Sequence, residues 1–249
     1  MLKLLLRFAV VPLSLCAGAG QGAEMKLIAA NAVKEGVVEI IEAFEKSTGH
    51  KVAATWSGTV PTEKRLFAGD VFDVIVIGSG AVDRLVAAGT LANRNRVEFA
   101  KTGIAIAARN GLANVDVSTS EAIKAAVLGA RSVAYSAGPS GAYIGDLFKR
   151  WGIPDRIADK VKQPSSGVEV AQVLSRGEAD LAFAQASEFR GVTNINPLGP
   201  LPADIQNFTI YSAAQHAQSV SPGVAEIFLK TLHSPASSLA IRKMGMEPE

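Results

Sequence analysis

The part of the chain that decides the fold reads RSVAYSAGPSGAYIGDLFKRWG, from Arg131 to Gly152. Its apolar beginning predicts a short strand, residues Ala137 to Tyr143 form a turn of small side chains, and the apolar spacing that follows predicts an amphipathic helix. Such a turn lets a ligand approach the backbone, and the free N–H groups at a helix start favour an anion. No Lys follows Gly141, so the turn does not match a nucleotide-binding loop. The segment predicts a cradle for a small anion, with an ordinary Gly-Pro turn as the simpler alternative.

The N-terminus has the features of a secretory signal peptide. Basic residues come first, then an apolar run, then a stretch rich in Ala and Gly. We expect residues 1–23 to be removed after Ala23, or alternatively after Ala19. The apolar run is shorter than the roughly 20 residues of a membrane-spanning helix. Cys16 follows Leu15, whereas a lipid-modified Cys normally follows a small residue. We therefore predict a periplasmic protein without a membrane anchor.

The predicted mature chain is close to electrically neutral. Removing residues 1–23 takes away two of the 25 basic residues and none of the 23 acidic residues, which leaves 23 of each. No basic run with interleaved aromatic residues is present, so we expect no binding of nucleic acid. The single Cys lies in the leader, which excludes a disulfide in the mature chain. The 249-residue length and the 48% hydrophobic content fit one or two globular domains, and we expect a monomer.

Strands and helices alternate along the predicted mature chain. The first series has strands at residues 25–30, 51–56 and 72–77, with helices at 37–44, 62–68 and 81–88. A long extended segment at 96–109 then leads to a second series. There Ser118 and Glu121 predict a capping box before a helix at 122–128. Alternation of this kind is typical of doubly wound parallel sheets.

The run PLGPLP at residues 197–202 predicts a return of the chain after the second series. We therefore predict an α/β fold with two doubly wound lobes and a ligand cleft between them. Residues 24–102 and 207–249 are expected to form one lobe, and residues 103–206 the other.

Small polar residues follow the predicted strands, where open α/β sheets bind their ligands. They are uncharged, so they would hold an anion through neutral donors, although each Ser could alternatively serve only as a helix cap. The candidate ligand-binding residues are Asn31, Ser57, Ser79, Ser140, Gly141, Tyr143 and Gln185.

No motif for catalysis, metal or cofactor is present in the sequence. His50, His216 and His233 are far apart and lack metal-ligand spacing. Ser140 does not lie in a Gly-x-Ser-x-Gly turn. We predict neither a metal nor a cofactor, and the catalytic residues, if there are any, stay unknown at this level.

The chain resembles the molybdate-binding-protein-like group of periplasmic solute-binding proteins, which have the type II periplasmic binding fold. The resemblance covers nearly all of the mature chain. It is carried by LIAANA at 27–32, RLFAG at 65–69 with DVIV at 73–76, YSAGPSGAY at 135–143, RGEAD at 176–180, and SPA at 234–236 with MGMEP at 244–248. The resemblance implies capture of a small anion and its delivery to the membrane permease of an ABC-type transporter.

Two departures from the family pattern argue against molybdate or tungstate as the ligand. Members that bind molybdate usually have a Ser after the first strand and often a Tyr in the late strand, whereas this chain has Asn31 and Gln185 there. A subgroup that includes periplasmic aconitate isomerase is more similar, because it shares the Tyr-Ser-x-x-x-Ser-Gly-x-Tyr turn and the return at 199–206. That resemblance implies an organic carboxylate as the ligand.

The same subgroup implies an alternative function, an isomerase that moves a proton between carbon atoms of a tricarboxylate. Such an enzyme needs a base within hydrogen-bond reach of an acidic carbon. Glu63, Glu188 and Lys34 lie near the predicted cleft loops in the sequence. Each of them is also readily explained as a solvated helix residue, so the sequence does not identify the base.

Overall fold

A computed structural model describes residues 22–112 and 115–249. Residues 1–21, which hold most of the predicted signal peptide with Ala19 and Cys16, lie outside this range. Within it, no helix combines the length and the apolar character needed to cross a membrane.

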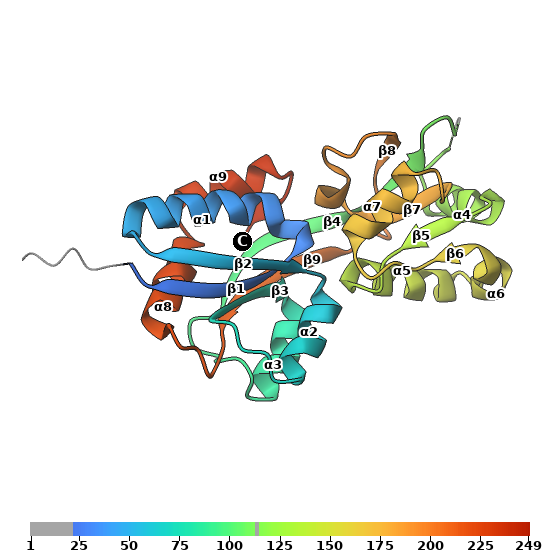
Figure 1. Cartoon of the computed structure of the whole chain (residues 1–249). Helices are drawn as coiled ribbons and strands as arrows, with labels where there is room; N and C mark the ends of the chain where they lie inside the picture. Colours follow the sequence, from blue (N-terminus) through green and yellow to red (C-terminus); the bar gives the residue numbers. More distant parts are fainter. Residues whose placement is uncertain (1–21, 113–114) are drawn as a thin grey trace, which may run out of the picture.

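The first lobe has a parallel arrangement of strands with helices on both faces, as the alternating pattern predicts (Figure 1). Its strand β3 is a continuous apolar run and all of its residues are buried, because helices cover both faces of the sheet. The elements are β1 (Glu24–Ala30), η1 (Asn31–Val33), α1 (Lys34–Thr48), β2 (Lys51–Ser57), α2 (Thr59–Phe67), β3 (Val74–Gly78), α3 (Ser79–Ala87), α8 (Pro222–Thr231), α9 (Pro235–Lys243) and β10 (Glu247–Pro248).

The second lobe, on the right in Figure 1, repeats this plan with shorter strands. Strand β5 pairs in parallel with β6 and β7, and β7 is buried throughout. The elements are α4 (Ser120–Gly129), β5 (Val133–Tyr135), α5 (Pro139–Arg150), α6 (Pro154–Ile157), η2 (Ala158–Lys160), β6 (Val161–Lys162), α7 (Gly167–Ser175), β7 (Leu181–Gln185), η3 (Ala186–Phe189) and β8 (Ile195–Pro200).

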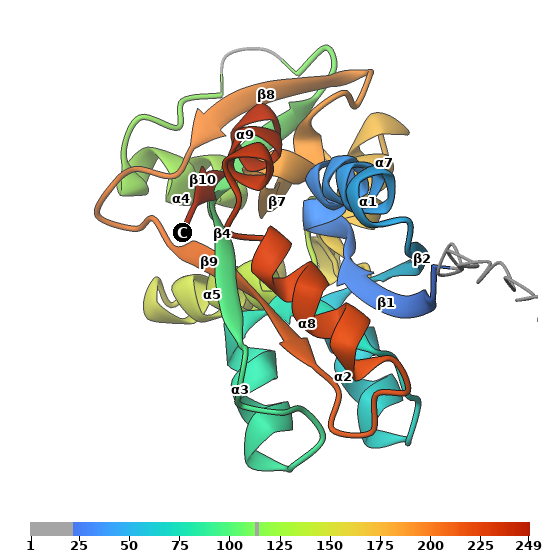
Figure 2. The same ribbon diagram turned by 90° about the vertical axis from the view of Figure 1, so that its left-hand side faces the viewer.

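Two long strands connect the lobes, β4 (Val97–Arg109) and β9 (Phe208–Gln215). The first part of β4 pairs with β9 and β10, and its last residues pair with β7 and β8 (Figure 2). The hydrogen-bonded path therefore runs β2-β1-β3-β9-β4-β7-β5-β6 without a break. Two separate sheets are not formed, because one extended segment serves both lobes.

The apolar cores nevertheless separate into two groups. In the first lobe, Phe44 and Phe228 lie in the cluster under α1, α8 and α9, and Leu85 lies in the cluster under α2 and α3. In the second lobe, Phe148 of α5 belongs to a cluster that also contains residues of α4 and α6, and Leu174 of α7 belongs to a separate cluster. This separation supports our proposal that the lobes comprise residues 24–102 with 207–249, and residues 103–206.

One local expectation was wrong, and one strand was not predicted. Helix α4 is capped by Thr119, whose Oγ1 accepts a hydrogen bond from the Ala122 backbone N at 3.1 Å, so Ser118 lies one residue too early to be the cap. The sequence did not predict a strand in the proline-rich return, where Ile195–Pro200 forms strand β8 beside β4. Pro is tolerated there because β8 pairs on one side only.

Candidate functional site

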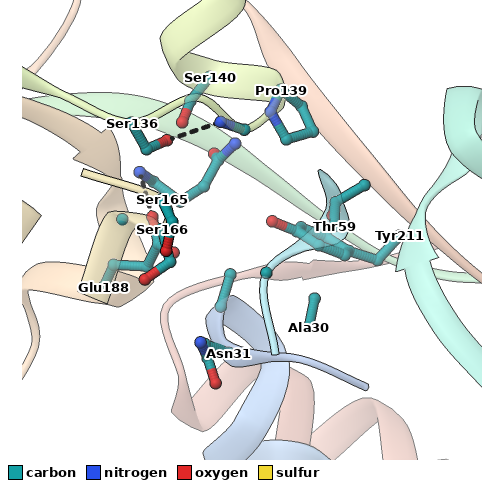
Figure 3. Close-up of a pocket in the computed structure, with 15 residues that line it drawn as sticks. Ala30, Asn31, Thr59, Ser136, Pro139, Ser140, Ser165, Ser166, Glu188 and Tyr211 are labelled. Atoms are coloured by element: carbon teal, nitrogen blue, oxygen red, sulfur yellow. Dashed lines mark hydrogen bonds between the residues drawn. The ribbon is translucent and has the colours of Figure 1, made fainter. Parts of the chain in front are cut away.

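A pocket lies between the two lobes (Figure 3). It lies at the carboxyl ends of the parallel strands, where open α/β sheets bind ligands. The lining residues are Ala30, Asn31, Ala32, Gly58, Thr59, Ser136, Gly138, Pro139, Ser140, Ser165, Ser166, Gly167, Gln185, Glu188 and Tyr211.

The beginnings of helices from both lobes meet at this pocket. Thr59 is the first residue of α2, Pro139 begins α5, Gly167 begins α7, and η1 leads into α1. First-turn N–H groups have no partner inside their own helix, and the helix dipole is positive at this end. No Lys or Arg within residues 22–112 and 115–249 lines the pocket. Backbone N–H groups and helix dipoles therefore supply the positive potential, which suits a small anion.

Hydroxyl groups complete the donor set. The Oγ of Ser136 accepts a hydrogen bond from the Gly138 N at 3.1 Å, and the Oγ of Ser166 accepts one from the Glu169 N at 3.3 Å. Each oxygen is thus occupied as an acceptor by the backbone. Because a hydroxyl group can also donate, these two O–H groups are free to point at a ligand.

Gly141 lets the beginning of α5 pack directly on the end of β5. A Cβ added at this position would lie 1.6 Å from the carbonyl oxygen of Ser136, which is backbone and cannot move aside easily. Close packing of α5 on the end of β5 therefore requires glycine at position 141 of the predicted cradle. It brings the first turn of α5, with Ser140, to the pocket.

Among the described residues, Glu188 is the only acidic side chain that lines the pocket. It lies on η3, just after β7, and its Oε2 accepts a hydrogen bond from the Gln185 backbone N at 3.0 Å. The carboxyl group also lies against the first residue of α7, because a Cβ added at Gly167 would be 1.7 Å from Oε2. Burial raises the pKa of Glu188 to about 7, although the hydrogen bond from Gln185 lowers it. Near neutral pH this carboxyl group can therefore accept or donate a proton.

Tyr211 faces Glu188 from the strand that connects the lobes. It lies on β9, is 3% exposed, and its ring belongs to the core of the first lobe. Its hydroxyl points into the pocket (Figure 3). Burial raises the pKa of Tyr211 well above its ordinary value, and the nearby charge of Glu188 adds to this effect. Tyr211 therefore stays protonated and can donate a hydrogen bond.

The structure brings three of the predicted ligand residues to the pocket and leaves the others outside its lining. Asn31, Ser140 and Gln185 line it, although the Gln185 amide is engaged by the Thr209 hydroxyl 2.5 Å away. The residues outside the lining are Ser57, Ser79, Gly141 and Tyr143.

Contacts elsewhere explain two of these outliers. The Ser79 hydroxyl donates to the Ile210 carbonyl oxygen at 3.0 Å, and the Tyr143 hydroxyl donates to the Ile205 carbonyl oxygen at 2.9 Å. Sequence reasoning did not select the lining residues Thr59, Ser136, Ser165, Ser166 and Tyr211. A partial signal existed for the Ser165–Ser166 pair, because it precedes a predicted helix, but nothing in the sequence singled out Tyr211.

Of the three candidate bases, only Glu188 lines the pocket. The Glu63 carboxylate pairs with the Arg84 guanidinium at 2.6 and 2.9 Å. The Lys34 ammonium lies 5.8 Å from the centre of the Trp56 ring. Among the described residues, no group of three or more His, Cys, Asp or Glu side chains could hold a metal ion.

The fold and the cleft between the two lobes define a class of protein. Residues 25–247 match the family model described as bacterial extracellular solute-binding protein, and the chain belongs to that family. Its fold is the type II periplasmic-binding-protein fold. The chain is 35% identical over 216 residues to an aconitate isomerase from a Pseudomonas species, a match that covers 84% of this chain and 82% of the relative.

Solved structures of binding proteins share the fold at low sequence identity. The periplasmic molybdate-binding protein of Azotobacter vinelandii superposes with a TM-score of 0.76 at 18% identity, covering 89% of this chain and 98% of that one. A sulfate-binding protein of Mycobacterium tuberculosis H37Rv superposes with a TM-score of 0.74 at 16% identity, covering 91% and 87%. Both similarities establish the fold, but at this sequence identity they do not identify the ligand of this chain.

Proposed function

We propose that this protein is an isomerase that binds a small polycarboxylate in the cleft and moves a proton between two of its carbon atoms. The observation that carries the proposal is the carboxyl group of Glu188 inside a pocket lined by helix starts and hydroxyl groups. In a site that only captures an anion, an ionised carboxylate in the lining would repel the ligand. A carboxyl group with a pKa near 7 is instead suited to proton transfer at neutral pH.

The anion-binding part of the proposal rests on the helix starts and hydroxyl groups around the pocket. Carboxylate oxygens accept hydrogen bonds from backbone N–H groups at a helix start. Because these donors come from both lobes, a ligand with more than one carboxylate can be held from two sides. The similarity to an aconitate isomerase agrees with a substrate of this chemical class.

In the proposed reaction, Glu188 removes a proton from a methylene carbon next to a double bond. The electron pair of that C–H bond forms a new double bond, and the original double bond takes up a proton at its far carbon. Atoms and charge balance with no other reactant. In aconitate this allylic shift moves the double bond from one arm to the other, which interconverts the cis and trans isomers.

The test is to incubate the exported protein with trans-aconitate and with cis-aconitate and to follow each isomer by proton NMR. Glu188→Gln should lower turnover by about 100-fold or more, since removing a general base typically costs 10²–10⁴-fold. Glu63→Gln is the matched control, because Glu63 pairs with Arg84 outside the pocket lining. Wild-type protein that binds these acids without converting them would defeat the isomerase proposal.

A second candidate is a receptor that delivers a small carboxylate to the membrane permease of an ABC-type transporter. This candidate is supported by two observations: the chain belongs to the solute-binding family, and hydrogen-bond donors from both lobes line the pocket. As part of this candidate we propose a monomer exported to the periplasm by residues 1–23. N-terminal sequencing of the exported protein checks the cleavage site.

Thermal shifts with molybdate, tungstate, sulfate and a panel of di- and tricarboxylates identify the ligand class. A ligand that binds only the folded state stabilises it by about 2.7 kcal/mol at 100 times its dissociation constant. We expect the carboxylates to raise the unfolding midpoint. A response to molybdate or tungstate alone would reject both carboxylate proposals.

A further inference from the structure

Among the described tyrosines, Tyr211 is the one that lines the pocket: the residue is buried as a whole, and its hydroxyl group faces the pocket. The hydroxyl of Tyr143 is engaged by the carbonyl oxygen of Ile205, and Tyr135 packs edge-on against Phe148 away from the pocket lining. Among contacts between described residues, the Tyr211 hydroxyl makes no hydrogen bond to another protein group. A hydroxyl group that opens onto a pocket takes its hydrogen-bond partner from the contents of the pocket, either water or a ligand. Its position beside Glu188 suggests that a bound ligand is the partner.

The proposed reaction builds up negative charge on the substrate inside the pocket, and this charge has to be stabilised. When a base removes the proton from carbon, the electron pair is shared with the adjacent double bond and with a carboxylate. The resulting dienolate carries one more negative charge than the bound substrate. In the part of the chain that the structure describes, no cationic side chain lines the pocket to balance that charge. A preorganised hydrogen-bond donor in a site that excludes water can stabilise such a charge.

Tyr211 has the properties of such a donor. Its ring is fixed in the core of the first lobe, so the hydroxyl is held in place before the ligand binds. Strand β9 holds the backbone on both sides, because Tyr211 pairs with Gly78 of β3 and with Ala100 of β4. A phenol that stays un-ionised gives a hydrogen bond without giving up its proton.

We propose that Tyr211 donates the hydrogen bond that stabilises the dienolate, while Glu188 alone carries the proton from one carbon to the other. In the first step a C–H bond of the methylene breaks and an O–H bond forms on Glu188. In the second step that O–H bond breaks and a C–H bond forms at the far carbon. Tyr211 keeps its proton throughout. This assignment rests on the proposed isomerase function.

The assignment makes a kinetic prediction for Tyr211→Phe, which keeps the ring and removes the hydroxyl. Loss of one donor to a developing oxyanion costs about 10²–10³-fold in kcat. We expect a fall of that size with trans-aconitate, a KM within about threefold of wild type, and an unchanged thermal unfolding midpoint. Tyr135→Phe removes a hydroxyl outside the pocket lining and should leave kcat unchanged.

The wild-type rate separates failure of this assignment from failure of the proposed function. Absence of wild-type turnover with either aconitate isomer would reject the isomerase and, with it, the role of Tyr211. If the wild type turns over and Tyr211→Phe retains kcat within threefold, Tyr211 is not the donor, although the isomerase stands. A lower affinity of Tyr211→Phe with an unchanged kcat would likewise overturn the assignment, because it indicates ground-state binding.

Discussion

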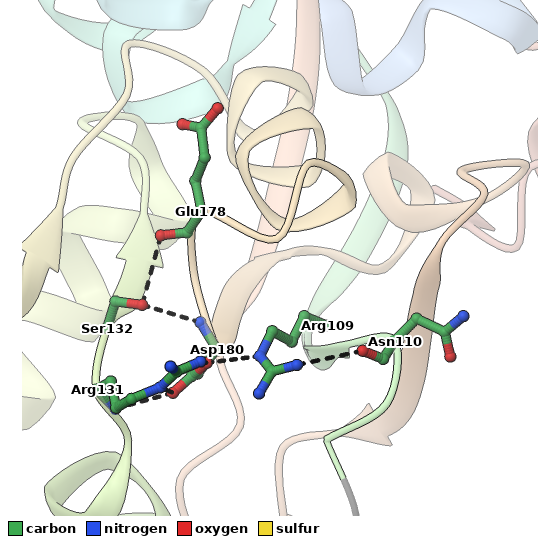
Figure 4. A network of polar contacts seen from close by, with 6 residues as sticks. All are labelled: Arg109, Asn110, Arg131, Ser132, Glu178 and Asp180. Atoms are coloured by element: carbon green, nitrogen blue, oxygen red, sulfur yellow. Dashed lines mark hydrogen bonds and ion pairs between the residues drawn. The ribbon is translucent and has the colours of Figure 1, made fainter.

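Replacement of Asp180 by Asn is expected to destabilise the second lobe without affecting the cleft. Asp180 lies just before β7, is 3% exposed, and is bound by two arginines (Figure 4). Its Oδ1 lies 2.7 Å from the Arg109 Nε and 2.9 Å from the Arg131 Nη2. Its Oδ2 accepts from the Arg131 backbone N at 3.0 Å and from its Nε at 3.1 Å.

The magnitude follows from the exposure of the partners. Breaking a buried ion pair by removing one member costs about 3–5 kcal/mol. Here the Arg131 side chain is 75% exposed and that of Arg109 is 27% exposed, so both can regain water. Asn also keeps one acceptor oxygen. We therefore expect a loss of about 2–3 kcal/mol, comparable to one or two hydrogen bonds to a charged group. For a chain of this size that is a fall of about 4–12 °C in the unfolding midpoint.

The pH dependence of this loss provides a sharper test. The Arg131 guanidinium beside Asp180 holds the pKa of that carboxyl well below its usual range, and Arg109 contributes to the same shift. A carboxyl with a lowered folded-state pKa stabilises the fold above its unfolded pKa, and this contribution is lost as the pH falls. The difference between wild type and Asp180→Asn should therefore be constant from pH 7 to about 5 and should shrink below about pH 4.

Urea denaturation at a series of pH values measures both effects. Asp155→Asn is the control, because Asp155 is exposed and forms no salt bridge among the described residues, so its cost should stay within about 0.5 kcal/mol. A loss below about 1 kcal/mol, or a difference that does not shrink in acid, would show that the network is worth no more than a surface ion pair.

Three further predictions concern the cleft. Isomerase activity should fall as the pH drops below about 7, because protonation of Glu188 removes the base. A pH–rate profile that does not fall on the acidic side would argue against Glu188 as the base. Gly141→Ala should cost about 2–3 kcal/mol in urea denaturation through a backbone clash, whereas Gly145→Ala on the same helix has room for its Cβ and should be neutral or stabilising. Ser166→Ala and Thr119→Ala each remove a helix cap worth about 1 kcal/mol, but only Ser166→Ala should weaken carboxylate binding in calorimetry, since only Ser166 lines the pocket.

Local sequence patterns were sufficient to predict most elements and the α/β class. The apolar runs that became β1 and β3 and the helical spacing of α1 act over a few residues, so they can be read without knowledge of the fold. The same holds for the cradle, since Gly138, Pro139 and Ser140 do line the pocket. The pattern did not predict β8, because pairing with β4 outweighs the low strand propensity of its prolines.

The catalytic candidates, by contrast, depend on distances that no local pattern contains. Glu188 follows β7 and Tyr211 lies on β9, and they face one pocket only because both strands pair with β4. The raised pKa of Glu188 results from burial at that meeting point, so it is a property of the tertiary structure. The sequence by itself determined most of the elements and the turns of small residues that line the pocket, because their causes are local. Only the packing of one lobe against the other decided which side chains line the cleft. The same packing set the pKa of Glu188.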